Sequence, residues 1–159
     1  MNKKIIEIDK LESSIADLKR DGLKIVFTNG CFDILHLGHI DYLSRAASFG
    51  DILIIGVNTD ESVKGLKGSG RPINDESSRA QLLAALEFVD VVVLFNDKTP
   101  IELIKTITPD ILAKGGDYKA EDVVGYEHVI TSGGEMRIID FLPGYSTSSI
   151  IQKILALNE

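Results

Sequence analysis

Short apolar runs alternate along the chain with longer stretches in which apolar residues recur every three or four positions. A short apolar run between turn residues is typical of a buried strand, and the three-to-four spacing is typical of a helix. The pattern predicts strands at residues 24–28, 51–58, 91–95, 110–114 and 135–141. It predicts helices at residues 9–20, 37–49, 77–88, 99–108, 121–132 and 146–157.

This order of elements predicts an α/β fold. Strands that alternate with helices form a parallel sheet covered on both faces, and right-handed crossovers then give a doubly wound, Rossmann-like sheet of five strands. The 159 residues fit a single domain, 1–159. Within it we expect an N-terminal helical extension at residues 1–22 and a core at residues 24–155.

The composition argues against several classes of protein. The net charge of −7 disfavours a nucleic-acid-binding surface but does not bear on nucleotide binding, which needs only local donors. The single cysteine argues against a disulfide framework and suits a reducing compartment. We find neither a secretion signal nor an apolar run of about 18 residues, so we expect a cytoplasmic protein with no nucleic-acid or membrane partner.

The most informative segment is TNGCFDILHLGH at residues 28–39, where the strand at residues 24–28 passes into a helix. Ligands of open α/β sheets bind at the carboxyl ends of strands, and the free N–H groups at a helix start attract anions. His36 and His39 lie three residues apart, so both rings can face one anion, and Gly38 lets a phosphate approach the backbone. The segment therefore predicts a phosphate-binding turn.

Metal ligation is the alternative for this histidine pair. The usual helical form is His-Glu-x-x-His with further ligands, but no glutamate lies between His36 and His39, and Cys31 is not at a ligand-like spacing. We therefore predict no metal site made by protein side chains, and we regard Cys31 as a small packing residue. His128 falls in a predicted surface helix, and we assign no role to it.

The string NGCFDILHLGH at residues 29–39 resembles the cytidylyltransferase-like branch of the nucleotidyltransferase superfamily, whose signature is His-x-Gly-His. The resemblance covers residues 24–155 and runs through the segments 57–60, 66–68, 71–74, 84–87, 89–90, 109–118 and 144–148. It implies that a substrate oxygen attacks the α-phosphorus of a nucleoside triphosphate and releases pyrophosphate. Such chemistry needs in-line positioning and neutralised charge.

The resemblance implies three catalytic residues, His36, His39 and Lys67. Both histidines would donate hydrogen bonds to phosphate oxygens, with His39 closer to the α-phosphate and the departing pyrophosphate. Lys67 would stabilise the leaving pyrophosphate. Neither histidine needs to act as a base, because a sugar phosphate already carries a negative charge.

Residues 64–76 contain three glycines and a proline, so we expect a mobile loop there and not a helix. Basic residues in a mobile loop beside a phosphate site suggest a lid. Lys64 and Arg71 lie in this stretch with Lys67 and would bind substrate. For Lys64 and Lys67 the alternative is a solvated loop lysine.

The nucleotide-binding residues that the resemblance implies are Thr28, Asn29, Gly30, Phe32, Gly38, Arg79, Gly144, Ser146, Thr147 and Ser148. The first three would cradle phosphates with backbone N–H groups, and Phe32 would mainly pack. Ser146 is a good N-cap, and the run of hydroxyls from it suggests a second helix N-terminus facing the β- and γ-phosphates. Ser148 stands where the family has threonine. Arg79 aligns with a family arginine; its alternative is an ordinary surface cation.

The string KGGDY at residues 114–118 ends a predicted strand, at the edge of the sheet where substrates bind. Its two glycines allow close approach to the backbone. Lys114 would hold a substrate phosphate and Asp117 a sugar hydroxyl, with a plain turn as the alternative. Asp33 is grouped with these substrate residues, as a turn cap or as a partner that orients nearby groups.

Two features distinguish subfamilies. Glycerol-3-phosphate cytidylyltransferases carry Arg-Thr just before the Gly-x-Ser-Thr-Thr segment, whereas this chain has FLP at residues 141–143. KGGDY, and RPIN at residues 71–74, are closer to the heptose 1-phosphate adenylyltransferases, which in many bacteria are fused behind a sugar kinase. The resemblance implies a stand-alone, homodimeric enzyme that makes ADP-heptose from ATP and heptose 1-phosphate, with Mg²⁺ bound to the ATP, for lipopolysaccharide or another surface glycan.

Other functions remain open at this stage. The same chemistry could use CTP with glycerol 3-phosphate or ATP with FMN, and a non-catalytic module that senses a nucleotide is a further alternative. A dinucleotide oxidoreductase fits poorly, because its Gly-x-Gly-x-x-Gly fingerprint should follow the strand at residues 24–28, where NGCFD stands instead.

Overall fold

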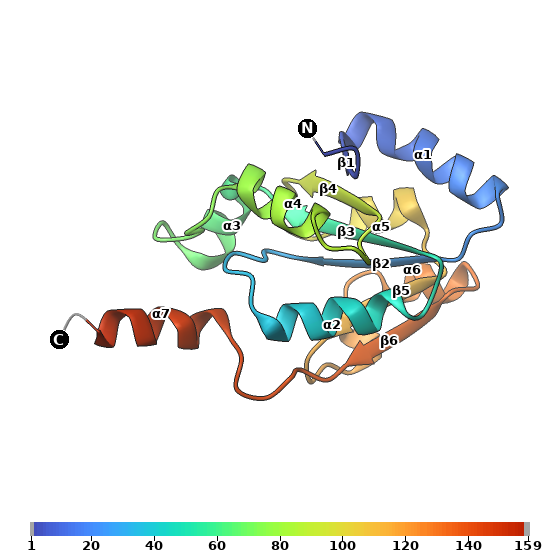
Figure 1. Cartoon of the computed structure of the whole chain (residues 1–159). Helices are drawn as coiled ribbons and strands as arrows, with labels where there is room; N and C mark the ends of the chain where they lie inside the picture. The colour runs from blue at the N-terminus through green and yellow to red at the C-terminus, as the bar shows by residue number, and fades with distance from the viewer. Residues whose placement is uncertain (1, 158–159) are drawn as a thin grey trace.

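The computed structural model describes residues 2–157 and shows a six-stranded parallel sheet with the order β1-β4-β3-β2-β5-β6 (Figure 1). The strands are β1 (Ile5–Ile6), β2 (Ile25–Gly30), β3 (Ile52–Asn58), β4 (Val91–Phe95), β5 (Ile111–Gly115) and β6 (Glu135–Ile139). The helices are α1 (Ile8–Arg20), α2 (Leu37–Ala47), α3 (Asp60–Lys67), α4 (Glu76–Ala84), α5 (Ile101–Ile107), α6 (Tyr126–Thr131), α7 (Thr147–Ala156) and a 3₁₀ turn, η1 (Ala120–Asp122).

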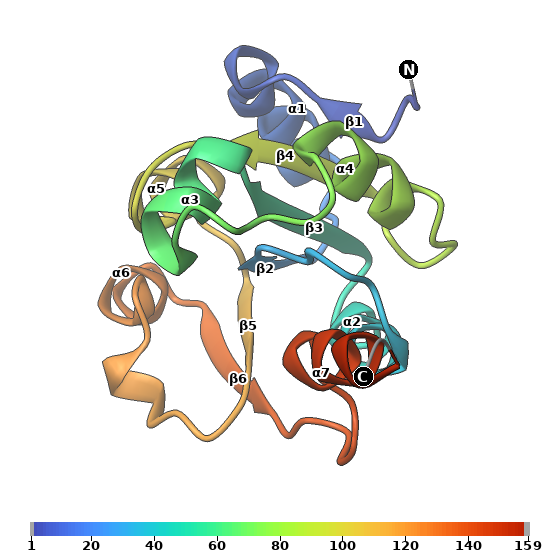
Figure 2. The same ribbon diagram turned by 90° about the vertical axis from the view of Figure 1, so that its left-hand side faces the viewer.

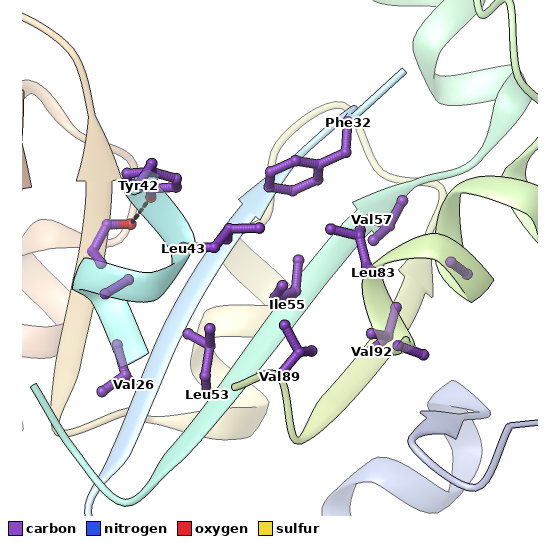
Figure 3. Packing of buried hydrophobic residues seen from close by; sticks show 14 of the residues in the cluster. Val26, Phe32, Tyr42, Leu43, Leu53, Ile55, Val57, Leu83, Val89 and Val92 are labelled. Atoms are coloured by element: carbon purple, nitrogen blue, oxygen red, sulfur yellow. Dashed lines mark hydrogen bonds between the residues drawn. The ribbon is translucent and has the colours of Figure 1, made fainter. Parts of the chain in front are cut away.

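Helices cover both faces of the sheet. One apolar cluster joins α2 and α4 to the strands and includes Leu43, Leu83 and Val92 (Figure 3). A second cluster joins α1, α5 and α6 to the strands. Ile54 and Ile55 are consecutive in β3 but belong to different clusters, because successive side chains of a strand point to opposite faces. The central strands are therefore buried on both sides, which is why they read as continuous apolar runs.

The expected sheet of five strands is wrong by one strand. Ile5 and Ile6 form β1, which pairs in parallel with Val92 and Val93 of β4. Two residues are too few to show a period, so the hydrophobic pattern gave no signal for this strand. The segment expected as a helical extension therefore also supplies an edge strand, which α1 follows directly.

The expectation of a loop throughout residues 64–76 is also wrong in part, because α3 runs to Lys67. The Thr59 hydroxyl caps this helix by accepting a hydrogen bond from Ser62 N. Val63 is fully buried and fixes the helix against the sheet. Gly65 costs a helix only about 1 kcal/mol, which the cap and the buried valine offset. The irregular segment begins at Gly68, whose φ of 95° ends α3.

The helix expected at residues 121–132 is interrupted in the same way. It is divided into η1 and α6 at Gly125, which has a φ of 90°. A left-handed residue cannot continue a right-handed helix, and glycine adopts this conformation at little cost. Figure 2 shows α6 beside β5 and β6, on the same face of the sheet as α5.

The strand order places a crevice at the carboxyl ends of β2 and β5. The chain proceeds from β2 through β3 to β4 on one side of the sheet, and then returns to add β5 and β6 on the other side. Ligands of doubly wound sheets bind at such a reversal. Register pairs join β2 to β5 only at Val26 and Phe27, so the last residues of β2, Asn29 and Gly30, extend past this pairing.

Among residues 2–157, no helix combines the length and the apolar character needed to cross a lipid bilayer.

Candidate active site

Two adjoining cavities lie at this edge of the sheet. The smaller cavity, of about 230 Å³, is lined by the ends of β2 and β5, including Asn29, Gly30, Lys114 and Gly115. The larger cavity, of about 300 Å³, lies between the start of α2 and the start of α7. Residues that line both cavities are His39, Tyr42, Lys67, Phe141 and Thr147. The two cavities together form the candidate active site.

The two motif histidines lie at the start of α2 and face each other. His36 is the N-cap residue, and its ring stacks on that of His39 with centroids 3.8 Å apart and 24° between the ring planes. Nδ1 of each ring is buried and has no hydrogen-bond partner among the residues that the structure describes. The two Nδ1 atoms are therefore unsatisfied within the described residues and shielded from solvent.

Both histidines are neutral near pH 7. Burial lowers the pKa of His36. Burial, followed by the nearby charges of His36 and Lys67, lowers the pKa of His39 to about 4. A neutral imidazole donates from one nitrogen only, so each ring offers one N–H group to a phosphate oxygen.

Gly38 lies between the histidines, and its missing side chain leaves room for neighbouring parts of the protein. A Cβ at this position would lie 3.0 Å from the Tyr145 Cβ and 3.1 Å from the His36 ring. Glycine therefore allows the segment before α7 to pack against the start of α2. Approach of a phosphate to this backbone stays a prediction.

The hydroxyl run at the start of α7 lies opposite the histidines. Ser146 is the N-cap and accepts a hydrogen bond from Ser149 N at 3.0 Å, as its position predicted. Ser146, Thr147 and Ser148 all line the larger cavity, together with both histidines. Gly144 lines neither cavity, and its φ of 87° forms the turn into the helix. The fold thus brings two helix N-termini from distant parts of the chain to one cavity.

Thr28 and Tyr42 form a buried hydrogen-bonded pair next to the two cavities. Both are buried, and their hydroxyls are hydrogen-bonded to each other. The Tyr42 hydroxyl also donates to the Ala113 carbonyl of β5 at 3.2 Å. Burial raises the pKa of Tyr42 to about 12, although its bond with Thr28 acts in the opposite direction, so the phenol stays protonated. Thr28 lines neither cavity.

Phe32 has the packing role expected of it. Its ring is buried and lies edge-on to His39, with centroids 5.3 Å apart and 63° between the planes. A Cβ on Gly30 would lie 3.0 Å from this ring, so a larger residue there would have to displace the ring slightly. Phe32 has a positive φ of 48°, which is uncommon for a residue with a side chain. This turn is held in place by its packing.

Asp33 orients neighbouring groups, which was one of its two expected roles. Its side chain is 2% exposed, and Arg71 Nε donates to Oδ2. The backbone N–H groups of Ile73 and Asn74 donate to Oδ1 at 2.8 and 2.9 Å. Burial alone would raise the pKa of Asp33, but these hydrogen bonds and the Arg71 charge hold it below its usual value.

Arg79 is fully buried, so the alternative of a surface cation is wrong. Its Nε donates to the Asn74 carbonyl at 3.0 Å, its Nη1 to the Cys31 carbonyl at 2.6 Å and its Nη2 to Asp60 at 2.8 Å. Arg79 lines neither cavity. It connects three segments around the site and has no nitrogen directed into it.

The remaining basic residues separate into two groups. Lys67, at the end of α3, lines both cavities, and Arg71 lines the larger one. Lys64 is exposed one turn earlier and lines neither cavity. Lys114 lines the smaller cavity, where burial lowers its pKa while nearby Cys31 acts in the opposite direction. Asp117 is exposed beyond the end of β5 and lines neither cavity.

Phe141 is a residue of the site that the sequence did not reveal. Its side chain is 64% exposed and lines both cavities. A Cβ on Gly115 would lie 2.7 Å from the Phe141 ring, and one on Gly116 would lie 3.0 Å from it. The paired glycines therefore make space for this aromatic ring, and close approach of a substrate to their backbone stays a prediction. The sequence did contain two signals of this contact: the paired glycines at the end of β5 and an aromatic residue just after β6.

The arrangement is suited to binding a polyanion. It combines two neutral imidazoles, the cations of Lys67 and Arg71, and two helix N-termini. Within residues 2–157 there is no group of three or more His, Cys, Asp or Glu side chains placed to hold a metal ion. Charge stabilisation of phosphates is the chemistry that these groups can perform.

Comparison with known sequences gives relatives over almost the whole chain. Bifunctional protein HldE of Citrifermentans bemidjiense is 54% identical over 153 residues, and that of Campylobacter fetus subsp. fetus is 55% identical over 152 residues. Each match covers 96% of this chain and 31% of the relative. The chain therefore spans less than a third of the length of these relatives.

Two solved structures resemble the fold. A lipopolysaccharide core biosynthesis protein from Thermoplasma volcanium GSS1 has a TM-score of 0.62 and 30% identity, covering 76% of this chain and 98% of that one. Pantoate-beta-alanine ligase from Francisella tularensis also has a TM-score of 0.62, at 18% identity, covering 98% of this chain and 79% of that one, and shows a shared fold alone. The cytidylyltransferase-like family matches residues 27–153, so the chain belongs to this family.

Proposed function

We propose that the chain transfers the AMP moiety of ATP to a heptose 1-phosphate, giving ADP-heptose and pyrophosphate. The observation that carries this proposal is the pair of cavities that meet at His39 and Lys67. One cavity offers hydroxyls and helix N-termini for a triphosphate, and the other offers Lys114 at an open strand edge for a second phosphate. A reaction between two phosphate groups needs two adjoining binding cavities, one for each substrate.

The relatives support the choice of substrates. The curated relatives are bifunctional proteins, and one solved relative is described as a lipopolysaccharide core biosynthesis protein. The strings KGGDY and RPIN resemble heptose 1-phosphate adenylyltransferases, and FLP replaces the Arg-Thr pair of the glycerol-phosphate branch. Synthesis of ADP-heptose for a surface glycan, in the cytoplasm and by a homodimer, completes the proposal.

The chemical step follows from the positions of the charged groups. An oxygen of the sugar phosphate attacks the α-phosphorus of ATP in line, and the bond to the β-phosphate oxygen breaks. His39 lies where the cavities meet and donates to the α-phosphate, while Lys67 neutralises charge on the departing pyrophosphate. The attacking oxygen is already anionic, so the step requires no general base.

We propose that Mg²⁺ enters with ATP, bound to phosphate oxygens and water. Asp33 is the one carboxylate among the described residues that line the cavities. Both of its oxygens are engaged by Arg71, Ile73 and Asn74. A metal ion carried by the nucleotide itself fits this set of donors, and the ion would supply further neutralisation of the phosphates.

The test is a matrix of four nucleoside triphosphates against heptose 1-phosphates, glycerol 3-phosphate and FMN, read by pyrophosphate release. We expect turnover with ATP and heptose 1-phosphate, and at least about tenfold lower kcat/KM for CTP with glycerol 3-phosphate, a difference of about 1.4 kcal/mol. Faster turnover of CTP with glycerol 3-phosphate would contradict the substrate assignment. No release with any pair would favour a nucleotide-sensing role.

A further inference from the structure

We infer that Asp33 is a positioning residue, which holds the Arg71 guanidinium so that it binds the terminal phosphates of the triphosphate in the larger cavity. The inference rests on the proposed function, because it concerns the triphosphate end of the same site. It makes the orienting role expected of Asp33 specific, because the group that Asp33 orients is the Arg71 guanidinium.

The contacts of Arg71 leave one edge of its guanidinium unsatisfied. Nε donates to Asp33 Oδ2, and the pair is well shielded, with the Arg71 side chain 18% exposed and that of Asp33 1% exposed. Arg71 Nη2 is buried but has no hydrogen-bond partner within residues 2–157. A buried donor without a partner costs free energy, which a bound anion recovers.

The surroundings of Arg71 identify what can satisfy this donor. Arg71 lines the larger cavity with His36, His39 and Lys67, and with the hydroxyls at the start of α7. Every one of these groups attracts or donates to an anion. A phosphate oxygen is the ligand that this combination selects, and a guanidinium presents a planar, fixed set of donors to it.

Asp33 determines where the guanidinium points. Arginine side chains have several rotatable bonds, and a hydrogen bond donated by Nε to a buried carboxylate fixes the plane of the guanidinium. The carboxylate is itself fixed by the amides of Ile73 and Asn74, and the Asn74 side chain donates to the Asp33 carbonyl at 2.6 Å. Because the guanidinium is already held in place, it loses little further rotational freedom when it binds a phosphate.

Asp33 also anchors the segment before α4, so its structural role must be separated from its action through Arg71. The Asp33→Asn variant achieves this. Its amide oxygen can still accept from Ile73 and Asn74, but its NH₂ group would meet Arg71 Nε, donor against donor. Asp60→Asn is the matched control, because Asp60 pairs with buried Arg79 in the same part of the fold, and neither residue lines a cavity.

The experiment measures the Kd of inorganic pyrophosphate, with Mg²⁺, by calorimetry on the full chain, beside the melting temperature of each variant. We expect Asp33→Asn and Arg71→Ala each to weaken binding about tenfold, the effect of one charge-assisted hydrogen bond. The double variant should bind no more weakly than Arg71→Ala alone. Arg71→Lys should recover part of the affinity, and Asp60→Asn should bind within twofold of the unmodified chain even if its melting temperature falls.

Pyrophosphate affinity within twofold of normal in Asp33→Asn would overturn the inference. Equal weakening by Asp60→Asn, or additive losses in the double variant, would also overturn it, because either result shows general disruption of the segment. The measurement uses no sugar phosphate. A chain that shows the expected binding pattern but makes no ADP-heptose would therefore count against the proposed function and not against the role of Asp33.

Discussion

The imidazole of His39 lies against that of His36 in a stack, with centroids 3.8 Å apart, and neither Nδ1 is hydrogen-bonded within the described residues. Burial lowers the pKa of both histidines, and for His39 the nearby charges of His36 and Lys67 lower it further. The pair is therefore a neutral donor surface until an anion arrives. The same pair of residues therefore links the His-x-Gly-His motif to the pH dependence of the protein's stability.

The lowered pKa of His39 predicts a loss of stability in acid. The unfolded residue titrates near 6.5 and the folded one at about 4, so the unfolded chain binds an extra proton between these values. The contribution of neutral His39 to the free energy of unfolding is fully present above pH 6.5 and is lost progressively as the pH falls towards 4. We expect the melting temperature to fall less from pH 7 to pH 4.5 in His39→Gln than in the unmodified chain. A midpoint near 6.5 for His39 in an NMR titration would contradict this.

Removal of the His39 imidazole should affect turnover far more than folding. We expect His39→Ala to lower kcat by about 100-fold, because a donor to the developing charge is lost. His128→Ala is the control, since His128 bonds to the Thr108 hydroxyl and lines neither cavity. Circular dichroism should show both variants folded. A His39→Ala rate within threefold of normal would exclude the role proposed for this residue.

Lys67 and Lys64 lie one turn apart on α3 and allow a matched comparison. Lys67 lines both cavities, whereas Lys64 lines neither. If Lys67 stabilises the departing pyrophosphate, Lys67→Ala should lower kcat more than it raises the KM for ATP. Lys64→Ala should leave both constants within about twofold. Similar losses from the two variants would indicate a diffuse charge effect in place of a specific contact.

Limited proteolysis should cut a narrower segment than the glycine content alone suggests. Helix α3 protects the chain up to Lys67, and Asp33 holds the amides of Ile73 and Asn74. Cleavage of the free protein should concentrate at the exposed residues 68–70. ATP with Mg²⁺ should slow this cleavage if the segment closes over the nucleotide. Equal cleavage with and without the nucleotide would argue against closure.

The long elements of the fold could be predicted from the hydrophobic pattern, because their periods extend over several turns or a whole strand. β1 was missed because two residues carry no period. The start of the irregular segment was misplaced because the local glycine signal was outweighed by a cap at Thr59 and by burial of Val63, which depends on the rest of the fold. Tertiary contacts decide such cases, and they are absent from a sequence pattern.

The site was predictable where a motif marks it and not elsewhere. His36, His39 and the hydroxyl run carry distinctive residue types, and the structure brings them to one cavity. Tyr42 could not be found, because an aromatic residue on the inner face of a helix reads as ordinary core. The full burial of Arg79 was equally hidden, since its partners are separated widely along the chain.

The hydroxyl of Tyr42 joins Thr28 on β2 to the Ala113 carbonyl on β5, across the point where the order of strands reverses. A single phenol thus links these two strands beyond the residues at which they are paired. Loss of the Tyr42 hydroxyl would leave the buried Thr28 hydroxyl without this partner, at a cost of about 1–3 kcal/mol, whereas loss of the Thr28 hydroxyl leaves Tyr42 bonded to the Ala113 carbonyl. A change at position 42 should therefore be tolerated less well than a change at position 28.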